Sequence, residues 1–258
     1  MSLSADTSTT TALALYDDWS ADALAECLGL PRVALFDSVT STLDVAHALA
    51  ARGASDGTLV LAAAQSAGRG RFGRTWTSEA GAGVWLTLIE RPRDATALEV
   101  LSVRVGIALA PVLDPLSEWP VQLKWPNDLY AGGRKLGGIL VEARWRDGAL
   151  DWIAIGVGIN VRRPPGEANA ASLRDGTSRI DVLREIMPRL RASAARVGPL
   201  DAAERAAFAA RDLGAGRQCV EPAVGRVIGI DDRGALLVET STGLIQARTG
   251  SLVFKEER

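Results

Sequence analysis

Three arginines and three glycines alternate in one short stretch of the chain. The stretch reads Gly68-Arg69-Gly70-Arg71-Phe72-Gly73-Arg74 and is followed by Trp76, with apolar, strand-like segments at 58–64 and 83–90 on either side. Glycine lets the backbone approach a ligand closely, and arginine presents a planar fork of donors that fits carboxylate and phosphate oxygens. The stretch therefore predicts a loop that closes on an anionic ligand. The alternative is a solvated basic surface loop.

The same glycines also satisfy the pattern G-x-G-x-x-G, which is typical of dinucleotide-binding folds. That pattern requires a strand before it and a helix that begins directly after it. Here Trp76 is followed by Thr77-Ser78-Glu79-Ala80-Gly81 and then by the strand-like segment 83–90. Because no helix is predicted at this point, a dinucleotide site is not predicted either.

A second group of polar residues follows a proline. The segment 121–125 alternates like a strand, and Pro126 ends it because proline cannot donate to a β-ladder. Asn127 and Asp128 then turn the chain. On pattern alone, a ligand site and a plain strand with an Asx-type turn are equally good interpretations.

Lys135 stands just before Gly137 and Gly138, at the start of another strand-like segment. Glycines inside a strand indicate close approach of a ligand or of neighbouring backbone. A further buried strand is predicted at 151–160, and it ends on Asn160. These residues form the second candidate site.

Ser41, with Asp44 three residues later, has the spacing of a capping box and predicts a helix that runs to about residue 51. The hydroxyl groups of Ser41 and Thr42 either cap this helix or bind a polar ligand group at its N-terminus. Spacing alone favours capping. His47, the only histidine, lies inside the helix, where a packed or exposed role is favoured over a catalytic one.

Composition excludes several classes of protein. The net charge of −2 over 258 residues gives no global signature of nucleic-acid binding. Cys27 and Cys219 are too far apart for a zinc motif. Neither a signal peptide nor an apolar run of membrane-spanning length is recognised, so a cytoplasmic protein is predicted. Residues 1–11 are expected to be frayed, and 12–30 are too few for a DNA-binding domain.

The order of the predicted elements indicates an α+β fold with two domains. Strands and helices alternate up to residue 213, with helices predicted at 99–113, 178–197 and 200–213. From 214 to 258, five short strands spaced eight to twelve residues apart predict a small β-barrel. The predicted domains are therefore 1–213 and 214–258.

Four motifs, taken in order, resemble those of biotin protein ligases, also called biotin–[acetyl-CoA-carboxylase] ligases. They are Gly68-Arg-Gly-Arg-Phe-Gly-Arg-Thr-Trp76, Lys124-Trp-Pro-Asn-Asp-Leu129, Arg134-Lys-Leu-Gly-Gly-Ile-Leu-Val-Glu142 and Gly156-Val-Gly-Ile-Asn160. The resemblance extends from about residue 33 to the C-terminus. It implies a class II synthetase-like catalytic domain with a mixed central sheet flanked by helices, followed by an SH3-like barrel.

The resemblance also implies an activity. Biotin and ATP would form biotinyl-5′-AMP, with Mg²⁺ as the metal ion, and a lysine of a biotin carboxyl carrier protein would then take the biotinyl group. By resemblance, the biotin side comprises Ser41, Thr42, Gln65, Arg69, Gly70, Arg71, Lys135, Gly137 and Gly138. The ATP side comprises Arg71, Arg74, Trp76, Asn127, Lys135 and Asn160, with Trp76 as the surface on which adenine stacks. Lys135, Arg69 and Arg71 would be catalytic, and Asp128 would orient or deprotonate the incoming lysine.

Two departures from the family pattern and two rival functions accompany this interpretation. Leu43 replaces the asparagine that usually follows the Ser-Thr pair, and Ser251 replaces an acidic residue after Gly250. The rivals are a lipoate or octanoate ligase on the same fold and a catalytically silent biotin-binding module. The family includes monomers and homodimers, and the magnesium ligands are unknown from sequence. A repressor role is not expected, because no DNA-binding domain is predicted.

Overall fold

The computed structural model describes residues 11–92 and 94–257. Its main feature is an eight-stranded mixed sheet with the strand order β1-β2-β3-β4-β8-β7-β6-β5. Only β2 and β3 run parallel, and the other neighbouring strands are antiparallel. The strands are β1 (Thr11–Ala12), β2 (Arg32–Val39), β3 (Thr58–Gln65), β4 (Gly83–Glu90), β5 (Gln122–Lys124), β6 (Asp128–Ala131), β7 (Arg134–Arg146) and β8 (Ala149–Asn160).

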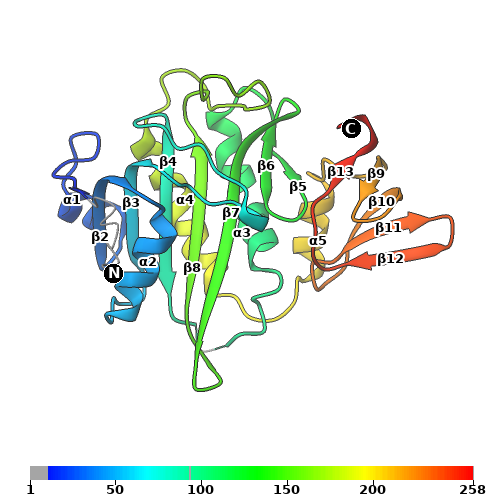
Figure 1. Ribbon diagram of the computed structural model, residues 1–258, viewed down its shortest axis with the longest axis horizontal. Coiled ribbons are helices and arrows are strands. Elements are labelled where there is room, and N and C mark those ends of the chain that lie inside the picture. Colours follow the sequence, from blue (N-terminus) through cyan, green and yellow to red (C-terminus); the bar gives the residue numbers. More distant parts are fainter. Residues whose placement is uncertain (1–10, 93, 258) are drawn as a thin grey trace, which may run out of the picture.

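Helices cover both faces of this sheet (Figure 1). Helix α2 (Thr42–Ala51) packs on one face against β3, β4 and β8, whereas α3 (Leu101–Leu113) and α4 (Arg179–Ala194) pack on the other. Helix α1 (Ala21–Leu28) contacts both β2 and α4. All eight residues of β4 are buried, as expected for a strand covered on both faces. This confirms the predicted mixed sheet flanked by helices.

A second, five-stranded antiparallel sheet follows α5 (Ala202–Ala209) and has the order β12-β11-β10-β9-β13. Several contacts join the C-terminal part of the chain to the rest of the fold, and two of them involve β5 and the residue that follows it. Leu123 of β5 exchanges backbone hydrogen bonds with Arg211 and Leu213 (2.8 and 2.9 Å), and Trp125 Nε1 donates to the carbonyl of Gly234 (2.9 Å). The predicted short strands are present as β9 (Gln218–Glu221), β10 (Gly225–Ile230), β11 (Leu236–Thr240), β12 (Gly243–Ala247) and β13 (Val253–Phe254).

Several boundary predictions were wrong, and the helix expected at 178–197, for example, ends at Ala194. The helix expected at 200–213 spans only Ala202–Ala209, because the chain beyond it turns and forms a single bridge between Asp212 and Leu123 of β5. Thr11, expected to be frayed with the rest of 1–11, instead pairs with Ser38 in β1. Residues 1–10, to which the rest of that prediction applies, lie outside the described residues.

The predicted capping box at the start of α2 was also wrong in part. Ser41 is the N-cap, as predicted, but its Oγ accepts a hydrogen bond from the backbone of Leu43 (3.3 Å). The Asp44 carboxylate does not close the box. It accepts a hydrogen bond from Thr40 Oγ1 (3.3 Å) and lies within 3.1 Å of Arg69 Nη2. Asp44 is therefore directed toward the arginine loop rather than toward its own helix.

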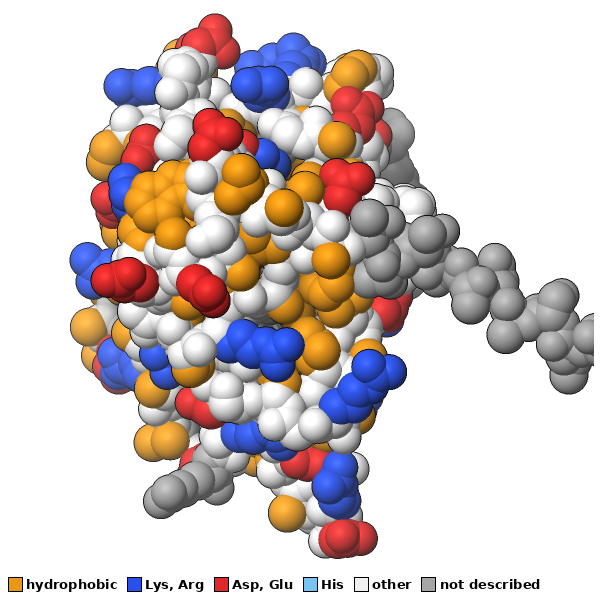
Figure 2. All heavy atoms as spheres, turned by 90° about the vertical axis from the view of Figure 1, so that its left-hand side faces the viewer, with side chains coloured by type: hydrophobic (Ala, Val, Ile, Leu, Met, Phe, Trp, Pro, Cys, Tyr) orange, Lys and Arg blue, Asp and Glu red, His pale blue; other side chains and the backbone are white. Residues whose placement is uncertain are grey.

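Acidic, basic and hydrophobic side chains are interspersed on the molecular face shown in Figure 2, which includes α1 and β2. Neither sign of charge forms a large field there. Within residues 11–92 and 94–257, helices that are both long enough and apolar enough to cross a membrane are absent.

The buried carboxyl group of Glu90 generates a prediction about stability. Glu90 ends β4 with 7% of its surface exposed, and Arg191 Nε lies 3.3 Å from its Oε1. Burial, reinforced by neighbouring Asp56, raises the pKa of Glu90 from 4.5 to about 8. Because the folded state then holds a proton that the unfolded state releases, this group's contribution to stability is complete below about pH 4.5. It is lost as the pH rises toward 8.

We expect Glu90→Gln to flatten this part of the pH profile, since the amide cannot ionise. The effect of one proton is limited to about 1.4 kcal/mol per pH unit. Urea unfolding of the wild type and of Glu90→Gln at pH 5, 6.5 and 8 measures the difference between their free energies of unfolding. If the free energies of unfolding of the wild type and the variant change in parallel across this range, the pKa of Glu90 is not raised by folding.

Candidate active site

A cavity of about 330 Å³ opens where the start of α2, the surface of β7 and β8, the arginine loop (residues 66–76) and the segment 251–253 meet. It gathers most of the residues singled out in the sequence. The cavity wall includes Ser41, Thr42, Gln65, Arg69, Gly70, Arg71, Arg74, Trp76, Asn127, Asp128, Lys135 and Gly138. Gly137 and Asn160 do not line this cavity.

One corner of the cavity is a buried polar network. Thr42 is 3% exposed, and its backbone N–H and its hydroxyl both donate to Gln65 Oε1 (2.8 and 3.2 Å). Thr87 donates to the Thr42 hydroxyl (2.9 Å), and Gln65 Nε2 donates to Ser78 Oγ (2.7 Å). These bonds fix the N-terminus of α2 against β3, so its hydroxyl groups are held in place before any ligand arrives. A helix N-terminus of this kind favours an anionic or polar group.

The cavity floor consists of glycines on two neighbouring strands. Gly138 of β7 is paired with Gly158 of β8, and Gly156 faces the same cavity. A Cβ at Gly158 would lie 2.7 Å from Trp76 Nε1, and a Cβ at Gly156 would lie 3.2 Å from Leu43 Cγ. Only glycine therefore leaves room for the indole of Trp76 to lie against the sheet.

Gly137 serves a different purpose from that expected of a ligand-facing glycine. A Cβ at this position would lie 2.7 Å from the carbonyl oxygen of Gly158, so the constraint comes from neighbouring backbone. The same sequence rule allowed either ligand or backbone as the reason for a strand glycine. In this pair, Gly138 faces the cavity and Gly137 faces protein.

Lys135 and Asp128 form an ion pair beside the indole of Trp76. Lys135 Nζ lies 2.9 Å from Asp128 Oδ1 and 5.2 Å from the centre of the Trp76 ring. A cation over an indole face is stabilised by the ring quadrupole. The ammonium group of Lys135 thus lies next to the flat indole of Trp76. This arrangement suits a nucleotide, whose phosphate would contact the cation and whose base would stack on the ring.

The three arginines of the loop contact different parts of the protein. Arg71 Nη1 donates to the carbonyl of Gly250 (3.1 Å), and Arg74 Nη2 donates to Ser251 Oγ (3.1 Å). Arg69 instead contacts Asp44 and Glu142. Burial lowers the pKa of Arg71, and nearby Asp128 opposes that shift. Arg71 and Arg74 thus join the loop to the C-terminal sheet, whereas Arg69 joins it to α2 and β7.

Asn127 is held by backbone bonds at the edge of the cavity. Its Nδ2 donates to the carbonyl of Ile139 (2.7 Å), and its own carbonyl accepts from the Ile139 N–H (2.9 Å). The predicted turn after Pro126 is therefore fastened to β7. This fastening positions Asp128, the next residue, opposite Gly138.

A second cavity, of about 670 Å³, lies next to the first and shares several wall residues with it, including Trp76, Lys124 and Lys135. Asn160, which was singled out in the sequence, lines this second cavity. Asn160 is 3% exposed, and its Nδ2 donates to the carbonyl of Ala171 (3.0 Å). Its Oδ1 is buried and finds no hydrogen-bond partner among the described residues. An unpaired buried acceptor of this kind is costly unless a ligand supplies a donor.

Sequence reasoning missed part of the wall. Gly156 and Gly158 alternate along β8, and their period of two could have shown that both face the cavity. The segment 251–253 comes from the C-terminal sheet, where no reactive residue was recognised, and only the tertiary fold brings it here. Within the described residues, no group of three or more His, Cys, Asp and Glu side chains is arranged to hold a metal ion.

Comparison with known proteins gives consistent matches. The profile of the Biotin/lipoate A/B protein ligase family matches residues 35–160, and that of the Biotin protein ligase C terminal domain matches residues 221–255. The Biotin--[acetyl-CoA-carboxylase] ligase of Mycobacterium tuberculosis is 36% identical over 241 residues, which cover 84% of this chain and 88% of that protein. The Bifunctional ligase/repressor BirA of Bacillus spizizenii is 32% identical over 81% of this chain and 69% of that protein. The match to BirA of Bacillus subtilis, at 38% identity, spans 51% of this chain and 41% of that protein.

Solved structures agree on the fold. The Biotin protein ligase from Aquifex aeolicus in complex with biotin and ATP superposes with a TM-score of 0.71, at 23% identity, over 86% of this chain and 98% of that chain. A ligase from Leishmania major in complex with Biotinyl-5-AMP gives a TM-score of 0.57, at 24% identity, over 84% and 98% of the two chains. From its two domain profiles and its two long alignments with curated ligases, this chain belongs to the biotin protein ligase family.

Proposed function

We propose that this protein is an ATP-dependent ligase that activates biotin as biotinyl-5′-AMP and transfers it to a lysine of a biotin carboxyl carrier protein. The observation that carries the proposal is the pair of adjoining cavities, which share Trp76 and Lys135 as a common wall. Both volumes lie in the range of small-molecule sites, about 300–1,000 Å³. An acid held in one cavity and a nucleotide held in the other would meet at Lys135.

The chemistry consists of two displacements. A biotin carboxylate oxygen attacks the α-phosphorus of ATP, the bond from that phosphorus to the bridging oxygen breaks, and pyrophosphate leaves. The neutral amine of the carrier lysine then attacks the carbonyl carbon of the mixed anhydride, the bond from that carbon to the phosphate oxygen breaks, and AMP leaves while the nitrogen gives up one proton to solvent. The first step brings two anionic groups together, so its main demand is preorganised positive charge. Arg71 and Lys135 line the first cavity and supply such charge.

On the biotin side, we assign the glycine floor to the ring system of biotin and the polar corner to its polar groups. Gly138 and Gly156 leave space above the sheet for a compact, fused ring system, and Leu43 adds apolar wall. Ser41, Thr42 and Gln65 offer polar contacts at the N-terminus of α2. In this assignment Leu43 replaces a polar contact by an apolar one. Gly70 brings the loop backbone to the same cavity.

On the ATP side, we assign the indole of Trp76 as the stacking surface for adenine. Asn160 Oδ1, a buried acceptor with no partner in the described part of the chain, suits the exocyclic amino group of that base. Arg74, Asn127 and Lys135 line the first cavity together with Trp76. Magnesium would enter with ATP, held chiefly by the triphosphate, and would offset phosphate charge.

Asp128 has a proposed role in the second step. In the structure its carboxylate is paired with Lys135 at 2.9 Å. When the phosphates draw Lys135 away, this carboxylate becomes available to orient the incoming carrier lysine. The proposed partner is thus a carrier protein in the cytoplasm. Monomeric and homodimeric forms of the ligase both fit this proposal.

The leading rival is a lipoate or octanoate ligase, because the family profile over 35–160 includes both kinds of enzyme. The C-terminal profile and the curated relatives are those of biotin ligases, and they favour biotin. A catalytically silent biotin-binding module is the third reading. It is disfavoured because Trp76, Lys135 and Asn160, which we assign to the nucleotide, all line the second cavity.

The test of this proposal is ATP–pyrophosphate exchange measured with biotin, with lipoate and with no acid. We expect exchange with biotin alone. Exchange with lipoate but not biotin would move the protein to the rival ligase class. Absence of exchange with either acid, while calorimetry still records biotin binding, would identify the silent module.

Two glycine variants should separate the two substrates. In Gly158→Ala the new methyl group overlaps Trp76 Nε1, which displaces the indole, so we expect KM for ATP to rise about tenfold or more. In Gly156→Ala the methyl group presses on Leu43 instead, so KM for biotin should rise more than KM for ATP. Steady-state exchange kinetics with each substrate varied in turn make the measurement. Equal effects of both variants on both constants would contradict the assignment of Trp76 to the nucleotide.

A further inference from the structure

We infer that Thr87 and Ser78 are positioning residues that fix the direction of the hydrogen bonds in the polar corner of the first cavity. The two residues are 0% and 5% exposed, and neither of them lines the cavity. They act through Thr42 and Gln65, which do line it. The inference deepens the proposed function and rests on it where the ligand is concerned, because it specifies which kind of polar group the corner can bind.

The orientation of the Gln65 side chain follows from its contact with α2. The backbone nitrogen of Thr42 lies 2.8 Å from Gln65 Oε1. A backbone N–H can only donate, so the atom that it meets must be the amide oxygen. Thr42 is the first residue of α2, and the first N–H groups of a helix have no acceptor within the helix. Gln65 therefore supplies the acceptor that this N–H lacks, and its amide nitrogen faces the other way.

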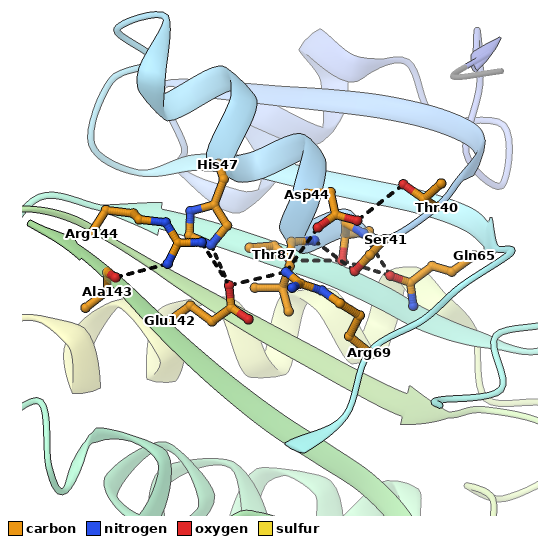
Figure 3. Close-up of polar contacts among 12 residues, drawn as sticks. Thr40, Ser41, Asp44, His47, Gln65, Arg69, Thr87, Glu142, Ala143 and Arg144 are labelled. Carbon is orange, nitrogen blue, oxygen red and sulfur yellow. Dashed lines mark hydrogen bonds and ion pairs between the residues drawn. The ribbon is translucent and has the colours of Figure 1, made fainter. Parts of the chain in front are cut away.

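The hydroxyl protons that lead to Gln65 then have only one possible direction. Gln65 Oε1 carries no proton, so the Thr42 hydroxyl, 3.2 Å away, must donate to it. This bond uses the single hydroxyl proton of Thr42. Thr87 Oγ1 lies 2.9 Å from Thr42 Oγ1 and must therefore be the donor of that pair. Figure 3 shows Thr87 and Gln65 reaching the start of α2 from the sheet.

The same argument applies to the nitrogen of the Gln65 amide. Gln65 Nε2 can only donate, so Ser78 Oγ, 2.7 Å away, accepts. The Ser78 proton is then directed to the carbonyl oxygen of Trp76, at 3.3 Å. The protons of the whole network therefore point one way, from Thr87 through Thr42 and Gln65 to Ser78. Thr87 and Ser78 are the two ends that set this direction.

This arrangement limits what the corner offers to a ligand. Thr42 uses both lone pairs of Gln65 Oε1. One N–H of Gln65 Nε2 has no acceptor among the described residues, and one lone pair of the Thr42 hydroxyl stays open. A ligand group that carries an acceptor and a donor side by side matches this pair. The ring urea of biotin has both, whereas the dithiolane ring of lipoate has neither.

A purely structural hydrogen bond is the competing explanation for Thr87, since buried polar groups are almost always paired. All eight residues of β4 are buried, and most of them are apolar. A valine at this position would have nearly the same shape and would need no partner. The two explanations differ in what the hydroxyl affects. A structural hydroxyl contributes to stability alone, whereas a positioning hydroxyl also changes the orientation of the corner and the binding of its ligand.

The first experiment measures, by NMR, hydrogen exchange of the Thr42 backbone amide in the ligand-free, full-length protein. Because Gln65 is the acceptor of this amide, its exchange rate reports whether the Gln65 side chain is held in place. We expect about fivefold faster exchange in Thr87→Val and in Ser78→Ala, which corresponds to the loss of about one hydrogen bond. Thr87→Ser, which keeps the hydroxyl, should exchange at nearly the wild-type rate.

Thr58→Val is the matched control for the loss of a buried hydroxyl. Thr58 is also 0% exposed, lies on β3 of the same sheet and has its hydroxyl 3.2 Å from Ser55 Oγ, outside the cavity wall. This variant should lose a comparable bond without changing the exchange of the Thr42 amide. Equal exchange rates in wild type, Thr87→Val and Ser78→Ala would overturn the inference. So would a rate in Thr58→Val as high as that in Thr87→Val.

The second experiment measures pyrophosphate exchange with biotin and ATP varied in turn. Thr87→Val and Ser78→Ala should each raise KM for biotin about fivefold, with KM for ATP and kcat changed less than twofold. Thr87→Ser should restore KM for biotin, and a KM equal to that of Thr87→Val would contradict the positioning role. Because amide exchange needs no ligand, a wild type that forms no adenylate would reject the proposed function. The exchange rates of Thr42 would still decide whether Thr87 and Ser78 position the corner.

Discussion

The contact between Trp76 and the backbone of Gly158 is the constraint on which the rest of the site depends. A single Cβ at Gly158 would come within 2.7 Å of the indole nitrogen, so the ring occupies space that any other residue would fill. From that position the ring supports Lys135 at 5.2 Å and forms the wall between the two cavities. It also ends the arginine loop, so the loop is anchored by packing at one limb and by ion pairs at the other.

Positive charge in the site is distributed rather than concentrated. Arg69 is balanced by Asp44 and Glu142, Lys135 is balanced by Asp128, and Arg71 and Arg74 rest on Gly250 and Ser251. Each cation therefore has a partner before an anion arrives, which avoids the repulsion that an empty cluster of guanidinium groups would create. The partners of Arg71 and Arg74 carry no charge, so these two arginines are the easiest to redirect toward a phosphate. The C-terminal sheet takes part in the site through those contacts.

Sequence patterns predicted the elements well and the contacts between them poorly. The strands at 58–64, 83–90 and 151–160 were correct because long, apolar, β-branched segments leave few alternatives. The helix after 200 was too long because its C-terminal end is decided by pairing with β5, which local sequence does not encode. For the same reason the segment 251–253 was missed. Gly137 and Gly138 could not be told apart until their neighbours, a carbonyl and a cavity, were known.

The most direct measurement is a crystal structure of the protein with biotin and ATP bound. We predict the fused ring of biotin above Gly138 and Gly156, the adenine against Trp76 in the cavity that Asn160 lines, and the reacting phosphate beside Lys135. Arg69 should keep its contacts with Asp44 and Glu142. A ligand held entirely on one side of Trp76, or a guanidinium of Arg69 that has left both carboxylates for the phosphate, would contradict this account.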